Sequence, residues 1–280
     1  MDWDSAQRRL RFPIYAPLQS ALSRLPAARW PDHADLTAAA GGVTTGRGVP
    51  IRFVNPREHT DRERRYYELR IAETGEVETR PENWHDIFNA LTWITYPQAK
   101  ATINAQHAAM LKERGEEEAK RRSPERDALT LFDEGGVVVA SSSPELMRLI
   151  VDFEWKQLFW SRRPELAGKM RFLGFGHGMY EQALEPYIGM VAKTVFVPVS
   201  ELFFMLPLES QVAQADVLLA AHFANRARYH SPKMMAPMPV LGVPGWHPDT
   251  DREAYYDDPV HFRASRPRPD RREGEGMIPP

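Results

Sequence analysis

Polar side chains that can do acid–base or metal chemistry follow one side of a helix expected to begin at Trp84. On a helix with 3.6 residues per turn, His85 and Asn89 lie within about 40° of each other, next to the apolar face. Asn83 is the expected N-cap, and Asp86 lies in the first turn. Such a row predicts a lined pocket in which an imidazole serves as metal ligand or general base. The alternative is an ordinary polar helix edge.

A second polar row follows Pro97, which fits the first turn of a helix running to about residue 121. Lys100, Asn104 and His107 recur at i, i+4 and i+7, so they share one side of the helix with apolar residues. Polar groups on a core-facing side are costly unless each finds a partner. The row is therefore either a site or a buried structural network. Because only a short break at Tyr96 separates the two helices, their polar rows can face each other.

A glycine-spaced turn, Gly-Phe-Gly-His-Gly at 174–178, lies between an expected strand and a short helix. Free N–H groups of Gly176, His177 and Gly178 at a helix start can hold an anion such as phosphate. His177 and Glu181, four residues apart, can also share a metal ion. The spacing differs from the dinucleotide-binding and P-loop patterns, and a tight structural turn is the alternative.

Together these segments predict one composite site. The predicted catalytic residues are His85, Asp86, Asn89, Lys100, Asn104 and His107. The predicted anion-binding residues are Gly176, His177, Gly178 and Arg126. The candidate ligands of a divalent metal ion are His85, His107, His177 and Glu181.

Composition limits what such a site can be. The 280 residues include no cysteine, which excludes disulfides, thiolate zinc sites, iron–sulfur clusters and a cysteine nucleophile. Lys+Arg is 36 and Asp+Glu is 38, and a net charge of −2 argues against a nucleic-acid coat or a polybasic membrane binder. No apolar stretch reaches the roughly 20 residues that span a bilayer, and no signal peptide is recognisable. We therefore expect a soluble cytoplasmic protein.

Two β-hairpins are expected to help position these residues. Residues 66–72 and 76–79 flank Glu-Thr-Gly, and residues 128–132 and 137–141 flank Asp-Glu-Gly-Gly. Charged residues over 112–127 predict a solvated helix end and loop. The remaining expected elements are strands at 51–54, 169–173 and 191–199, and helices at 20–25, 84–94, 143–160, 179–185 and 208–228.

These elements predict a single α+β domain, with helices packed on small antiparallel hairpins or a sheet. A Pro-rich, aromatic segment over 232–262 is expected to wrap irregularly over the core. We expect residues 1–50 to be an N-terminal extension, 51–262 the main domain and 263–280 a disordered, locally basic tail.

One long motif resembles a known family. It is Thr79-Arg80-Pro81-Glu82-Asn83-Trp84-His85-Asp86-Ile87-Phe88-Asn89-Ala90-Leu91-Thr92-Trp93, continuing to Pro97, Lys100, Asn104 and His107. The motif is similar to that of an uncharacterised proteobacterial family, a domain of unknown function. Segments at 127–134, 175–178 and 241–246 fit the same resemblance, which covers roughly residues 50–262. The resemblance implies a bacterial cytoplasmic protein and supplies no reaction.

Two functions fit these residues. The first is a hydrolase acting on a phosphoester or another anionic small molecule, in which a metal ion or histidine base activates water and Lys100 stabilises negative charge. The second is a non-catalytic binding or assembly protein, with the polar rows as structural networks and a partner surface around Trp246. RNA binding through the basic tail is a weaker third hypothesis, because no RNA-binding module is recognisable.

Overall fold

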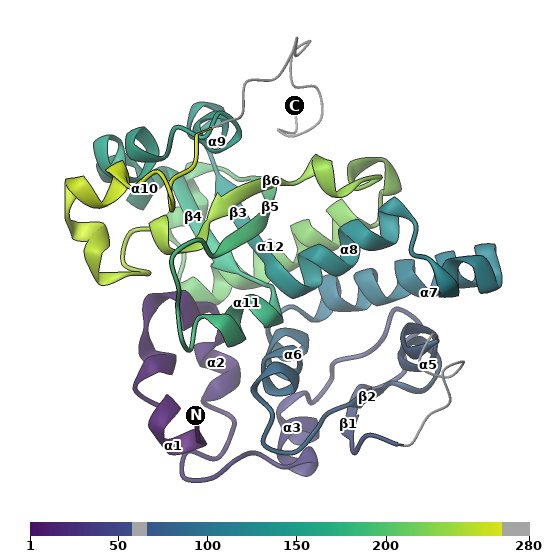
Figure 1. Cartoon of the computed structure of the whole chain (residues 1–280). Helices are drawn as coiled ribbons and strands as arrows, with labels where there is room; N and C mark the ends of the chain where they lie inside the picture. The colour runs from purple at the N-terminus through teal and green to yellow at the C-terminus, as the bar shows by residue number, and fades with distance from the viewer. Residues whose placement is uncertain (58–65, 265–280) are drawn as a thin grey trace.

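A four-stranded mixed sheet forms the centre of the computed structural model, which describes residues 1–57 and 66–264 (Figure 1). Its strand order is β4-β3-β5-β6. β3 and β5 are parallel, whereas β4 and β6 pair antiparallel to their neighbours. The strands are β3 (Gly136–Ser141), β4 (Met170–Gly174), β5 (Val191–Pro198) and β6 (Ala236–Pro239).

Helices cover both faces of this sheet, which explains why β3 is an uninterrupted apolar run. Val137 and Val139 enter one core, whereas Val138 and Ala140, pointing the other way, enter a second. The elements of the first core include α1 (Trp3–Ala6), α2 (Gln19–Leu22), α3 (His33–Ala39), α6 (Trp84–Thr95), α9 (Pro144–Val151), α10 (Arg163–Lys169) and α11 (His177–Gln182). Those of the second include α7 (Pro97–Lys120), α8 (Pro124–Gly135) and α12 (Leu208–Phe223).

The α+β class predicted from the sequence is confirmed, but neither expected hairpin exists. Residues 67–74 form helix α5 (Tyr67–Thr74), and Gly75, with a φ of 70°, ends this helix instead of turning a hairpin. The following strand β2 (Glu76–Glu78) pairs parallel to β1 (Arg52–Val54). The second predicted hairpin is the end of α8 running directly into β3.

Several boundaries also differ from the expected ones. The helix expected over 143–160 ends at Val151 and is followed by a π-helical turn at 157–161. The charged run at 112–127 is not solvated throughout, because Glu118 and Arg126 are buried and form an ion pair. The C-terminal wrap contributes strand β6 to the central sheet. From residue 265 onward the predicted tail lies outside the described residues.

Residues 1–50 are part of the packed structure. Trp3, Tyr15 and Leu36 are buried in the same core as Phe88 of α6. Trp3 stacks on Trp84 with ring centroids 5.2 Å apart, which fixes the start of α6. In Figure 1 these N-terminal helices lie against α6 and α11.

Helix α7 receives its N-cap from another helix. The Asp216 carboxylate on α12 accepts hydrogen bonds from the backbone N–H groups of Gln98 and Ala99 at 3.0 and 2.8 Å. It therefore satisfies two donors that a helix start leaves without an intrahelical partner. Burial raises the pKa of Asp216 to about 6, although both N–H groups act to lower it.

This capping predicts a pH dependence of stability. The pKa of Asp216 in the folded protein exceeds its ordinary value of 3.8, so folding favours the protonated form. The contribution of this group to the unfolding free energy is fully present below about pH 4. It is lost as the pH rises through 6, by up to about 3 kcal/mol. We expect Asp216→Asn to remove this part of the pH dependence, measured by urea unfolding at pH 4.5 and 7.5. If the unfolding free energy changed equally between pH 4.5 and 7.5 in both proteins, the pH dependence could not be assigned to Asp216.

Candidate active site

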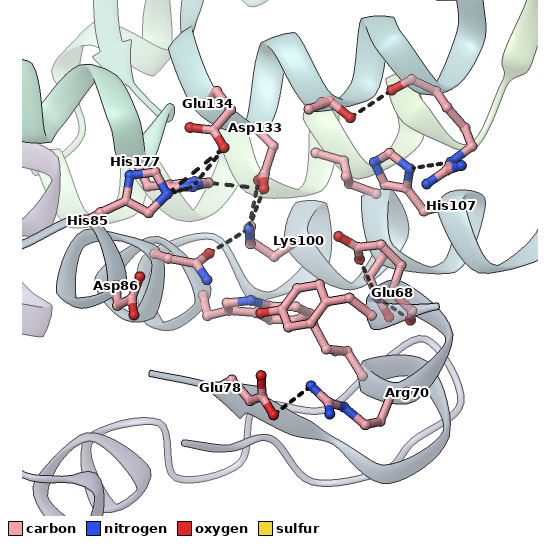
Figure 2. A pocket seen from close by; sticks show the side chains of 18 of the residues that line it. Glu68, Arg70, Glu78, His85, Asp86, Lys100, His107, Asp133, Glu134 and His177 are labelled. Atoms are coloured by element: carbon pink, nitrogen blue, oxygen red, sulfur yellow. Dashed lines mark hydrogen bonds and ion pairs between the residues drawn. The ribbon is translucent and has the colours of Figure 1, made fainter. Parts of the chain in front are cut away.

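A cavity of about 700 Å³ opens between α5, α6, α7, α8 and the start of α11 (Figure 2). It lies within the size range of small-molecule sites, roughly 300–1,000 Å³. Its lining includes three histidines, His85, His107 and His177, as well as Lys100 and Glu134. The polar rows of α6 and α7 therefore face a common cavity.

Two of these histidines meet at one end of the cavity. The Nε2 atoms of His85 and His177 lie 3.2 Å apart, although 92 positions separate the residues in the chain. Oε1 of Glu134 lies 3.4 Å from Nε2 of His177 and 4.0 Å from Nε2 of His85. His177 is 5% exposed, whereas the Glu134 side chain is 47% exposed.

These three atoms can hold a metal ion. Their separations of 3.2, 3.4 and 4.0 Å form a triangle whose centre lies about 2.1 Å from each atom. Zinc binds imidazole nitrogen at about 2.0–2.1 Å and carboxylate oxygen at about 2.0–2.2 Å. Two imidazoles and one carboxylate also leave coordination positions for water or substrate, as catalytic metal sites require.

A carboxylate faces the remote nitrogen of each imidazole. Nδ1 of His85 lies 3.0 Å from Oε2 of Glu181, and Nδ1 of His177 lies 3.7 Å from Oδ2 of Asp133. The Glu181 carboxylate is within hydrogen-bond distance, so it can hold the proton of His85 on Nδ1 and direct the Nε2 lone pair toward a metal. Nδ1 of His177 is buried and has no hydrogen-bond partner among the described residues, so Asp133 acts on this imidazole through its charge. When both imidazoles carry their proton on Nδ1, the two Nε2 lone pairs lie beside Glu134, an arrangement that a cation would stabilise.

Lys100 links this cluster to the polar row of α7. Its Nζ donates to both carboxylate oxygens of Asp133 at 2.7 and 2.9 Å, and to Oδ1 of Asn89 at 2.9 Å. Burial opposes ionisation of Asp133, but Lys100 and His177 outweigh it and lower its pKa. Asp133 therefore remains anionic behind His177. The pKa of Glu134 is lowered as well, chiefly by the interaction with His177, whose Nε2 lies 3.4 Å from Oε1.

The glycines of the 174–178 turn allow α8 and α11 to approach closely. A Cβ on Gly176 would lie 2.4 Å from the Gly136 nitrogen and 2.6 Å from the Glu134 carbonyl oxygen. A Cβ on Gly178 would lie 2.7 Å from Oε2 of Glu134. Without side chains at these positions, the start of α11 packs on the end of α8 and brings His177 beside Glu134.

Hydrogen bonds tie α6 to the same turn. Thr92 donates to the carbonyl of Phe175 at 3.2 Å, and the Tyr96 hydroxyl donates to that of Gly174 at 2.9 Å. The Tyr180 hydroxyl reaches the same Gly174 carbonyl at 2.6 Å. These contacts position His85, near the other end of α6, beside His177.

The opposite end of the cavity holds a second polar group. Nδ2 of Asn104 donates to the backbone oxygen of Glu68 and to its Oε2, at 2.9 and 2.7 Å. Nδ1 of His107 accepts a hydrogen bond from Nε of Arg126 at 3.2 Å. Figure 2 shows Glu68 and His107 on the other side of Lys100 from His85 and His177.

The predicted residues thus divide into separate groups. His85 and His177 meet as expected, but Glu181 lies behind His85 instead of joining the three-atom cluster. Among the described residues, His107 belongs to no such cluster and contacts Arg126 instead.

Other predicted residues have structural partners. Asp86 accepts hydrogen bonds from the Arg80 guanidinium at 2.9 Å and from its backbone N–H at 2.7 Å. Burial opposes ionisation of Asp86, yet Arg80 outweighs it and lowers the pKa. The N–H of Gly176 donates to the Gly136 carbonyl, and Arg126 donates to the backbone carbonyl of Glu118. These donors are therefore not free for the predicted anion.

Comparison with known proteins places this site in a family. A family model described as protein of unknown function, DUF3025, matches residues 51–266. The chain belongs to the DUF3025 family. The DUF3025 region contains every residue of the cluster, whereas the helices of residues 1–50 lie outside it. No curated protein and no solved structure matches the chain.

Two residues of this DUF3025 site, Asp133 and Glu134, were assigned to a hairpin turn in the sequence analysis. A signal for the helix was present, because Ser123-Pro124-Glu125 repeats the Ser-Pro-Glu pattern that begins α9 at Ser143. In both helices the serine side chain accepts from the backbone N–H three residues on. Gly135 and Gly136 follow Glu134, and because such glycines are typical of hairpin turns, the sequence favoured a hairpin over this helix.

Close packing at Gly176 yields a test of how the cluster is held. We expect Gly176→Ala to lower the unfolding free energy by roughly 1–3 kcal/mol and to weaken metal binding, because α11 must move away from α8. Gly168→Ala in α10 is the matched control, since its Cβ would meet nothing within 4 Å. That control is expected to gain about 0.5–1 kcal/mol. Equal stability and metal affinity in the two variants would contradict the packing argument.

Proposed function

We propose that this protein is a metal-dependent hydrolase acting on an anionic ester, with a phosphoester as the leading substrate class. One observation carries the proposal: His85, His177 and Glu134 present three donor atoms about 2.1 Å from a common point. Three further observations support it: Glu181 lies 3.0 Å from Nδ1 of His85, Asp133 lies 3.7 Å from Nδ1 of His177, and all three donor residues line the cavity.

A bound divalent ion would lower the pKa of a coordinated water to about 7 and so supply hydroxide near neutral pH. His85, His177 and Glu134 would hold that ion. Glu181 contacts Nδ1 of His85 at 3.0 Å, Asp133 lies 3.7 Å from Nδ1 of His177, and Lys100 balances the charge of Asp133. With one carboxylate ligand, a divalent site keeps a net positive charge that favours an anionic substrate.

The cavity wall offers a further cation to such a substrate. Arg122 lines the cavity and forms no hydrogen bond or ion pair within residues 1–57 and 66–264. Its guanidinium suits bidentate binding of a phosphate or carboxylate group. Lys100, 5% exposed, also reaches the cavity but is already bonded to Asp133.

A non-catalytic binding protein is the second candidate. The contacts of Arg126 with His107 and Glu118 favour it, because they are typical of a buried structural network. The partner surface expected around Trp246 does not support it, since Trp246 is 9% exposed and packs into the first core.

We propose a bacterial cytoplasmic location, which rests on the sequence resemblance. Among the described residues, no helix combines the length and apolar character needed to cross a bilayer.

Metal binding tests the cluster directly. The purified chain is expected to bind one equivalent of Zn²⁺, measured by calorimetry and metal analysis. His85→Ala, His177→Ala and Glu134→Gln should each weaken binding more than about 100-fold, and Glu181→Gln roughly 10–100-fold. His107→Ala and the exposed His230→Ala serve as controls and should retain the metal. Unchanged metal content in His85→Ala and His177→Ala would contradict the proposed metal site.

Hydrolysis tests the reaction. We expect the zinc-loaded protein to cleave a para-nitrophenyl phosphate mono- or diester, and chelation or His85→Ala to reduce the rate at least about 100-fold. Para-nitrophenyl acetate, which carries no negative charge, should be a poorer substrate. Activity that survives complete metal removal would count against the proposed mechanism, and metal binding without any hydrolysis would favour the binding protein.

A further inference from the structure

The end of the cavity away from the metal cluster holds a buried hydrogen-bond acceptor that has no partner among the described residues. Asn104 is 2% exposed, and its Nδ2 donates to two acceptors of Glu68. Because both partners are acceptors, the amide nitrogen must face Glu68, and Oδ1 must point elsewhere. Oδ1 is buried and accepts no hydrogen bond from any described residue. Such a group costs roughly 1–3 kcal/mol unless a ligand uses it.

A donor of fixed identity lies three residues further along the same side of α7. Nε of Arg126 can only donate, so Nδ1 of His107 accepts and the proton resides on Nε2. Burial lowers the pKa of His107, which keeps the ring neutral. Within the described part of the chain its Nε2–H donates to no residue, and His107 lines the cavity. Asn104 and His107 thus form a fixed acceptor and donor pair.

Aromatic and aliphatic side chains also line this cavity. They include Trp93, Tyr67 and Ile103. Lys100 covers the Trp93 ring with its Nζ 5.3 Å from the ring centroid, which fixes the indole. Planar heterocycles pack well on such walls, and their edges offer an N–H donor next to an acceptor.

We propose that this end of the cavity recognises a nucleobase edge, so that the substrate class is a nucleotide. The inference rests on the proposed function, which assigns the phosphoester group to the metal end. Asn104 Oδ1 accepts from a base N–H, and His107 Nε2–H donates to the neighbouring base nitrogen or oxygen. Asn104 and His107 are binding residues here and take no part in bond cleavage.

Binding of nucleoside 5′-monophosphates tests this proposal without requiring turnover. Calorimetry on the zinc-loaded full chain compares AMP, CMP, GMP and UMP with ribose 5-phosphate, which lacks the base. We expect at least one nucleotide to bind about 10-fold or more tightly than ribose 5-phosphate, a difference of about 1.4 kcal/mol. Asn104→Leu should abolish this preference while leaving the affinity for ribose 5-phosphate unchanged.

The controls separate the two proposals. Thr102→Ala, on the same helix, removes a hydroxyl that contacts only the Gln98 carbonyl and should keep the preference. His85→Ala should weaken all phosphate ligands alike but preserve the order among bases. If the wild-type protein shows the base preference but neither binds a metal nor hydrolyses a phosphoester, the proposed function is overturned and the nucleobase subsite is retained.

Equal or tighter binding of ribose 5-phosphate by the wild-type protein would overturn the subsite. So would failure of all four nucleotides to bind at millimolar concentration, or a preference retained in Asn104→Leu. The wild-type comparison decides the question even if the loss of two hydrogen bonds to Glu68 prevents Asn104→Leu from folding.

Discussion

Close contact between the end of α8 and the start of α11 is the constraint on which the site depends. α8 runs directly into β3, and β4 ends at Gly174, opposite Val137 near the start of β3. The antiparallel pair therefore places a helix end and a helix start at the same edge of the sheet (Figure 1). Gly176 and Gly178 let the two approach until Glu134 and His177 touch. A larger residue at either position would separate the carboxylate from the imidazole.

Charge compensation stabilises the buried part of this cluster, Lys100, Asp133 and His177. Asp133 sits behind His177 and is neutralised by Lys100 from α7, and Glu181 sits behind His85. An unpaired buried charge such as that of Asp133 would be strongly destabilising, and the Glu181 contact also restricts the orientation of the His85 imidazole. Because Lys100 comes from α7, the metal cluster is coupled to the helix that carries Asn104 and His107. Asp216 on α12 holds the start of that helix, so the second core supports the cavity from behind.

Local signals located the two central helices well. Asn83 caps α6 with its side chain on the N–H of Asp86, and Pro97 begins α7, both as expected. Their polar rows face a common cavity because only Tyr96 separates the helices. The hairpin predictions failed because a glycine after a helix and a glycine in a hairpin turn give the same local pattern. At Gly75 and at Gly135-Gly136 the chain ends a helix instead of turning a hairpin, and tertiary packing decides between these two conformations.

The sequence by itself determined the α+β class, the absence of thiol chemistry and the family resemblance, and it nominated His85 and His177 as candidate site residues. Helical periodicity and capping are local, so they can be read from neighbouring residues. Only the tertiary structure decided that Glu134 completes the cluster, that Glu181 lies behind a ligand and that His107 faces Arg126. The contacts join residues far apart in the chain, and their geometry depends on how β3 and β4 pair and how closely α8 and α11 pack. Periodicity within one helix contains no information about the distance between two helices.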